Sequence, residues 1–266
     1  MRILLVEDQA PLAALVRNNL QADFGFEVDF SPDPIHARAL LAANRYDVVV
    51  VDLLYDGLAS DYSRRRAAGA ISLRHDRQFQ LSGLAVLQAM AASDGPRAVA
   101  WTTGDARREL HLLLAYEEFQ IRSFCSKETG KDLTPLVSAI RAAASHQAHR
   151  DPLLDPYLPP TGQRPLRELL FGKQLWRGVW RALAIGARSH QEIADLVNYS
   201  VKSNRNEVRY MTDALVELNP GMAGQRARSD ALVGYAEAHW EFFLDDTVMR
   251  LFPPPGMRFL GLPDNE

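Results

Sequence analysis

Cysteine is almost absent from this chain of 266 residues, because Cys125 is the only one. A single cysteine excludes an intramolecular disulfide and any zinc site built from several thiolates. Long apolar runs are missing too, since no stretch of about 18 apolar residues is present to span a bilayer. The opening "MRILLVEDQA" reaches acidic residues too early for a signal peptide. We therefore expect a cytoplasmic protein with no membrane partner.

A strong excess of charge of one sign is also missing, since 30 basic and 33 acidic residues leave a net charge of −3. This balance argues against a protein that coats nucleic acid or an anionic membrane. The charge is nevertheless uneven: residues 1–163 carry −3, residues 164–230 carry +4 and residues 231–266 carry −4. With 47% apolar residues and this length, the chain is expected to fold into two globular domains.

Prolines gather between the acidic and basic segments, in "HRDPLLDPYLPPTGQRP". Proline removes a backbone donor and disfavours helix in the residue before it. We therefore expect an extended linker over residues 147–165, with one domain over residues 1–146 and a second over residues 166–266.

The first domain alternates strand and helix signals. Five short apolar runs, at residues 2–6, 26–30, 46–54, 97–102 and 121–125, alternate with five helical patterns near 12–20, 34–43, 83–92, 106–117 and 131–144. Such alternation requires right-handed crossovers and a parallel sheet covered on both faces. The expected fold is α/β, a doubly wound, flavodoxin-like sheet of five parallel strands, and ligands of such sheets sit at the carboxyl ends of the strands.

Acidic residues stand at two of these strand ends. Glu7 and Asp8 follow the first strand, and Asp52 follows the third. Neighbouring strands in a doubly wound sheet would bring the three carboxylates together, where they would repel one another unless a cation were bound. Hard oxygen ligands of this kind favour Mg²⁺.

Two further strand ends carry residues suited to phosphate chemistry. Thr102 ends the fourth strand and Lys127 follows the fifth. A metal-bound aspartate beside a lysine and a hydroxyl can accept a phosphoryl group, because metal and lysine neutralise its equatorial oxygens. Asp47 and Asp56 are rival acceptors, and Thr103 is a weaker rival of Thr102.

Together these residues resemble the receiver domain of a bacterial two-component response regulator. The motifs are "LLVED", "VVVVD", "AVAWTT" and "SFCSK". The resemblance implies the following roles: Asp52 as phosphoacceptor, Glu7, Asp8, Asp52 and the carbonyl of Leu54 as Mg²⁺ ligands, Thr102 and Lys127 as phosphate contacts, and Thr102 with Phe124 as the switch pair.

Two features depart from that family's pattern. Asp56 stands where the family usually has proline, and an insertion of roughly twenty residues follows, at about 55–80. The insertion carries Arg64, Arg65, Arg66, Arg74 and Arg77. It is either a solvated charged loop or a lid or partner-docking element that senses charge on Asp52.

The second domain has a helix-turn-helix pattern. An apolar helix ends near Gly186, and the next begins at Ser189 with Glu192 three residues on, as in a capping box. A third helix follows Ser200. One of its faces is apolar, and the opposite face carries polar residues suited to the major groove of DNA: Lys202, Ser203, Arg205, Asn206 and Arg209.

This stretch is similar to the LuxR-type helix-turn-helix output domain. The matching positions are Gly186, Ser189, Glu192, Ile193, Ala194 and Ser200. Trp176 and Gly178 replace glutamates of the family's first helix, and Ser203-Asn204 replace its Thr-Val. Residues 229–252 form an additional amphipathic helix, which either packs on its own domain, docks on the receiver or forms a dimer contact.

The combined interpretation is a non-enzymatic regulator of transcription. The resemblance implies phosphorylation of Asp52 by a sensor histidine kinase with Mg²⁺ bound, a homodimer, and binding to double-stranded DNA. Two alternatives remain: a regulator that acts through protein contacts, and an atypical receiver that regulates DNA without phosphate.

Overall fold

The structure is a computed structural model that describes residues 1–57, 60, 63–64, 80–91, 97–129, 132–160, 162–219 and 228–254. The described residues up to 160 form one compact unit, and those from 162 onward form another. Most of the arginine-rich insertion, including Arg65, Arg66, Arg74 and Arg77, lies outside the described residues.

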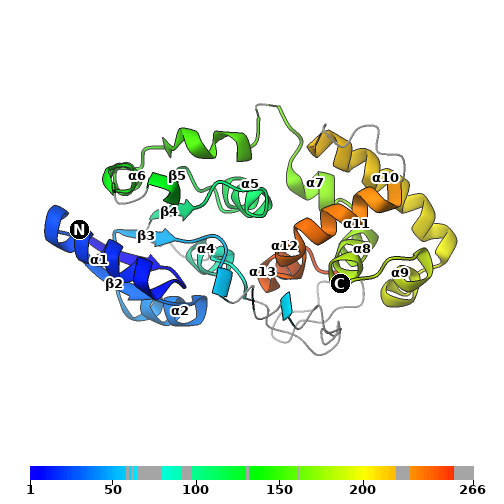
Figure 1. The fold of residues 1–266 in the computed structure, drawn as a ribbon, viewed down its shortest axis with the longest axis horizontal. Helices are drawn as coiled ribbons and strands as arrows, with labels where there is room; N and C mark the ends of the chain where they lie inside the picture. The colour runs from blue at the N-terminus through cyan, green and yellow to red at the C-terminus, as the bar shows by residue number, and fades with distance from the viewer. Residues whose placement is uncertain are drawn as a thin grey trace. The chain divides into compact units, whose positions relative to one another are not determined.

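The first unit contains a parallel sheet in the order β2-β1-β3-β4-β5-β6 (Figure 1). Its strands are β1 (Arg2–Val6), β2 (Glu27–Ser31), β3 (Val48–Val51), β4 (Arg97–Thr102), β5 (Ser123–Ser126) and β6 (His149–Arg150). Every pair of neighbours runs parallel. The expected doubly wound α/β fold is confirmed, with one strand more than the five expected.

Helices cover both faces of this sheet (Figure 1). They are α1 (Ala10–Phe24), α2 (Pro34–Ala43), α4 (Leu84–Ala91), α5 (Glu109–Glu117) and α6 (Thr134–Ala144), with short 3₁₀ helices η1 (Lys127–Thr129) and η2 (Pro152–Tyr157). Residues Ile3 and Val50 pack with α1 and α6 on one face. Helices α2, α4 and α5 follow one another along the other face. All of β3 is buried, as a parallel strand between two helical layers requires.

The proline-rich segment differs from the expected linker. Residues His149–Arg150 form β6 on the edge of the sheet, and η2 follows directly. Asp151 explains the difference, because its carboxylate accepts hydrogen bonds from Ser126 N at 2.9 Å and Leu153 N at 3.0 Å. Leu154 is fully buried. Residues 149–158 therefore belong to the first unit rather than to an extended linker.

The second unit is helical. Its helices are α7 (Leu166–Phe171), α8 (Gln174–Ile185), α9 (His190–Val197), α10 (Val201–Leu218), α11 (Arg228–Ala238), α12 (Trp240–Leu244) and α13 (Asp246–Leu251). The helix boundaries expected from the sequence are present. Gly186 ends α8 at φ +127°, the capping box of Ser189 and Glu192 begins α9, and Ser200 caps α10.

The C-terminal segment is not the single helix expected over residues 229–252. It is broken into α11, α12 and α13, and Asp245 caps α13 by accepting from Thr247 N and Val248 N. Its aromatic face packs within the second unit, where Phe243 stacks on Trp180 and Phe252 stacks on Phe171. These contacts agree with the first of the three alternatives for this segment, packing on its own domain. None of the described helices is long and apolar enough to cross a membrane.

Candidate functional site

The three acidic residues meet at the carboxyl edge of the sheet. β1 and β3 are hydrogen-bonded neighbours, with Val6 opposite Val51, so the residues that follow them emerge side by side. One carboxylate oxygen from each of Glu7, Asp8 and Asp52 lies within 4.8 Å of the others. Glu7 and Asp52 are fully buried. This edge is the point where the strand order reverses, the usual place for a ligand in such a sheet.

Lys127 lies between two of these carboxylates. Its Nζ is 2.5 Å from Glu7 Oε2 and 2.7 Å from Asp52 Oδ2, and 4.9 Å from the centre of the Trp101 ring. Burial, and then the neighbouring Asp52, raise the pKa of Glu7 to about 7. Burial also raises the pKa of Asp52, although Lys127 opposes that shift. Three carboxyl groups face one lysine here, so a further cation would favour their ionised forms.

The site also contains buried oxygens without a hydrogen-bond partner among the described residues. They are Asp8 Oδ1 and Thr102 Oγ1. Leu54, two residues after Asp52, donates its N–H to Asp52 Oδ1 at 3.3 Å. An open carboxylate oxygen beside two further carboxylates fits a hard cation such as Mg²⁺, and an open hydroxyl at the end of β4 fits a phosphate oxygen.

The remaining candidates fall in different places. Phe124 is buried on β5, and the centre of its ring lies 6.3 Å from the centre of the Tyr116 ring. Asp47 precedes β3, at the opposite end from Asp52, where it accepts from Arg2 N. Asp56 pairs with Arg108 at 2.7 Å.

Gly83 is a site residue that the motif analysis did not single out. A Cβ at this position would lie 2.2 Å from the Asp52 carbonyl oxygen and 2.2 Å from Val51 Cγ1. Only glycine permits such an approach to the backbone of Asp52. Its signal in the sequence is the "SGLAVL" that opens α4.

The candidate DNA-contacting residues lie together at the beginning of α10. Lys202, Ser203, Arg205, Asn206 and Arg209 are all exposed. The opposite side of the helix is buried through Val208 and Met211. Arg209 is partly held by Tyr210, whose hydroxyl it contacts at 3.1 Å.

One departure from the LuxR-type pattern, Trp176, has a structural explanation. Trp176 donates from Nε1 to Glu207 Oε2 at 2.7 Å, and Lys173 pairs with the same carboxylate at 2.8 Å. Glu207 belongs to α10, so this contact joins α8 to the helix that carries the exposed basic residues. An aromatic residue at position 176 therefore has a defined partner.

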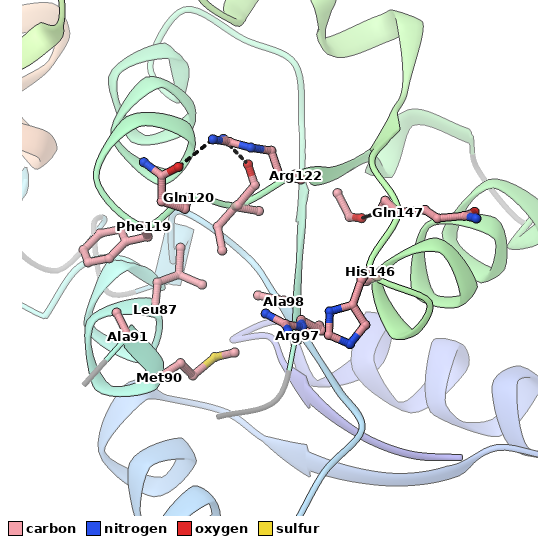
Figure 2. A pocket seen from close by; sticks show the side chains of 13 residues that line it. Leu87, Met90, Ala91, Arg97, Ala98, Phe119, Gln120, Arg122, His146 and Gln147 are labelled. Atoms are coloured by element: carbon pink, nitrogen blue, oxygen red, sulfur yellow. Dashed lines mark hydrogen bonds between the residues drawn. The ribbon is translucent and has the colours of Figure 1, made fainter. Parts of the chain in front are cut away.

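A cavity of about 460 Å³ lies at the amino ends of β4 and β5, away from the acidic cluster (Figure 2). Leu87 and Met90 contribute apolar lining, and Arg97 and His146 contribute polar lining. Arg122 donates to Gln120 Oε1 at 2.6 Å and to backbone carbonyls. None of the candidate site residues lines this cavity.

Comparison with known proteins gives structural likeness only. No family model and no curated protein matches the chain. Among solved structures, the two-component response regulator RcsB in complex with DNA has a TM-score of 0.53 and 16% identity, over 90% of this chain and 98% of that chain. RcsB from Salmonella enterica serovar Typhimurium, bound to promoter rprA in the presence of the phosphomimetic BeF₃⁻, has a TM-score of 0.52 and 17% identity over the same shares.

At these identities the likeness establishes the fold. The chain shares the fold of these RcsB structures, with a parallel α/β sheet followed by a helical unit. The resemblance expected from the sequence motifs is confirmed at this level.

Proposed function

We propose that this protein is a response regulator that is phosphorylated on Asp52 with Mg²⁺ bound and regulates transcription by binding DNA through α10. The observation that carries the proposal is the convergence of Glu7, Asp8 and Asp52 beside Lys127. The RcsB structures support it as complexes of similarly folded chains with DNA.

The residues of the site divide the work of phosphoryl transfer. An oxygen of Asp52 forms a bond to phosphorus while the bond between phosphorus and the donor breaks, and the donor leaves with the electron pair. Lys127 neutralises negative charge on the transferred group, and the Thr102 hydroxyl donates to one of its oxygens. Mg²⁺, held by Glu7, Asp8, Asp52 and the carbonyl of Leu54, would supply the remaining positive charge.

The donor in this proposal is the phosphohistidine of a sensor kinase. Small acyl phosphates have the same reactive phosphoryl group and replace it in a test. We further propose that the phosphorylated chain acts as a homodimer on double-stranded DNA, so that two copies of α10 contact successive major grooves about one helical turn apart.

Phosphorylation is tested with acetyl phosphate and Mg²⁺, with intact-mass measurement of the full chain. We expect one phosphoryl group on the wild type and none on Asp52→Asn. Asp47→Asn is the matched control, because it removes an aspartate from the other end of β3 and should be labelled normally. Labelling of Asp52→Asn to the wild-type extent would refute the acceptor assignment.

DNA binding is tested by gel shift on random-sequence duplexes at several salt concentrations. Removing Arg205 or Arg209 should weaken binding and flatten the salt dependence, because each phosphate contact releases counterions. Arg164→Ala is the control, since Arg164 pairs with Glu217 away from the beginning of α10. Binding that neither variant changes would favour regulation through protein contacts instead.

A further inference from the structure

Arg108 places a buried guanidinium beside the candidate phosphorylation site. Only 6% of its side chain is exposed, and Nη2 lies 2.7 Å from Asp56 Oδ2 while Nη1 pairs with Asp105. Its Nε has no hydrogen-bond partner among the described residues. A guanidinium has five N–H donors, two on each Nη and one on Nε. This one donates from both Nη atoms and leaves the Nε donor open among the described residues.

The chain brings this guanidinium to the same edge of the sheet as Asp52. Arg108 lies in the segment that follows β4, which ends in Thr102, and Asp56 lies in the segment that follows β3. Burial lowers the pKa of Arg108, but Asp105, Asp56 and Asp52 together raise it above its ordinary value. Burial raises the pKa of Asp52, and Lys127 and then Arg108 oppose that rise. The geometric link between them is Asp56, which lies four residues after Asp52 and is 2.7 Å from Arg108 Nη2.

On the basis of the function proposed above, we propose that Arg108 is a second phosphoryl-binding residue beside Lys127, and that Asp56 competes with the phosphoryl group for it. In the unphosphorylated chain, Asp56 holds the guanidinium. After transfer, the guanidinium donates to the phosphoryl oxygens on Asp52 instead.

The exchange of partners follows from charge and exposure. Phosphorylation replaces one negative charge on Asp52 by about two and adds strong acceptor oxygens that match the guanidinium fork. Asp56 is 39% exposed, so water can solvate it when the ion pair opens. Arg108 is buried and keeps Asp105 as a partner, so the exchange leaves no unpaired buried charge. The phosphoryl group is a stronger partner for the guanidinium than Asp56.

The competition predicts opposite effects for the two halves of the ion pair. The probe is BeF₃⁻ titrated into the full chain with saturating Mg²⁺, followed by calorimetry. Arg108→Gln should weaken BeF₃⁻ binding by roughly tenfold to a hundredfold, the effect of losing a charge-assisted hydrogen bond. Arg108→Lys, which keeps the charge and loses the fork, should show a smaller loss. Asp56→Asn should strengthen binding by several-fold.

Arg107→Gln is the matched control, because Arg107 is the neighbouring residue and lies near the same carboxylate at 3.5 Å, but its side chain is 45% exposed. It should bind BeF₃⁻ as the wild type does. A purely structural role for the ion pair would make Arg108→Gln and Asp56→Asn weaken binding together, and that result would overturn the competition.

The same titration separates the two proposals. A wild-type chain that does not bind BeF₃⁻ with Mg²⁺ would refute the phosphorylation proposal itself. A wild-type chain that binds it, with Arg108→Gln, Arg108→Lys and Asp56→Asn all unchanged, would refute only the role of Arg108.

Discussion

Gly83 sets the distance between helix α4 and the strand that carries Asp52. The space for its Cβ is already occupied by the Asp52 carbonyl oxygen and by Val51 Cγ1. We expect Gly83→Ala to lower the free energy of unfolding of the first unit by about 1–3 kcal/mol, because overpacking forces backbone to move. Urea denaturation measures the change, and loss of BeF₃⁻ binding should accompany it.

Gly234 provides the matched control for that substitution. It lies in α11, and a Cβ there meets nothing within 4 Å among the described residues. Gly234→Ala should be neutral or slightly stabilising, since alanine favours helix. Equal stability of Gly83→Ala and the wild type would contradict the close approach of α4 to β3.

Cys125 should be chemically inert in the folded chain. The residue is fully buried on β5, and burial together with the charge of Asp151 raises the pKa of its thiol to about 12. The thiol stays protonated at pH 8, and the thiolate is the reactive form. Iodoacetamide should therefore modify the native chain very slowly at pH 8 and the urea-unfolded chain quickly. Rapid modification of the native chain would contradict this environment.

Single residues differ in how far the sequence reveals their position. Glu7, Asp8 and Asp52 could be placed near one another because strand ends are readable from apolar runs, and parallel strands end at one edge. Arg108 could not, because its hydrogen bond to Asp56 joins residues 52 positions apart in the sequence. Its position depends on tertiary contacts.

At the scale of elements, β6 and η2 connect the first unit to the chain that follows it. Asp151 fixes both, because its N–H donates to the Phe124 carbonyl and its carboxylate accepts from Ser126 N. Asp151→Ala should lower the free energy of unfolding of the first unit by about 1.5–3 kcal/mol, the contribution of hydrogen bonds to a charged group. Thermal or urea unfolding of the full chain checks this.

Asp155→Ala is the comparison for that prediction. Asp155 belongs to the same η2 helix, but its ion pair with Arg150 is about half exposed. Such pairs contribute about 0–1 kcal/mol. If the two variants were equally stable, Asp151 would not hold this segment on the sheet.

Elements were readable from the sequence where the signal is local. The capping box of Ser189 and Glu192 and the cap at Ser200 lie where their residue types predict helix beginnings. β6 was not readable, since two residues among prolines carry no periodicity and their pairing depends on β5. The tail divides into three helices because His239 separates α11 from α12 and Asp245 begins α13, two interruptions that the apolar spacing does not show.

At the scale of the whole molecule, the uneven charge agrees with the division into two units. The net charge of −3 conceals a segment of +4 over residues 164–230, which contains the exposed face of α10. A near-neutral chain can thus carry a local basic surface. The fold class followed from the alternation of strands and helices. The insertion at about residues 55–80 could be recognised only by its length.

We propose that phosphate on Asp52 controls the binding of DNA by α10. Fluorescence anisotropy of a labelled duplex, with the full chain titrated in Mg²⁺ with and without acetyl phosphate, tests it most directly. We predict that acetyl phosphate tightens DNA binding by the wild type by several-fold and leaves Asp52→Asn unchanged. Equal DNA affinity of the wild type before and after complete phosphorylation would contradict the account.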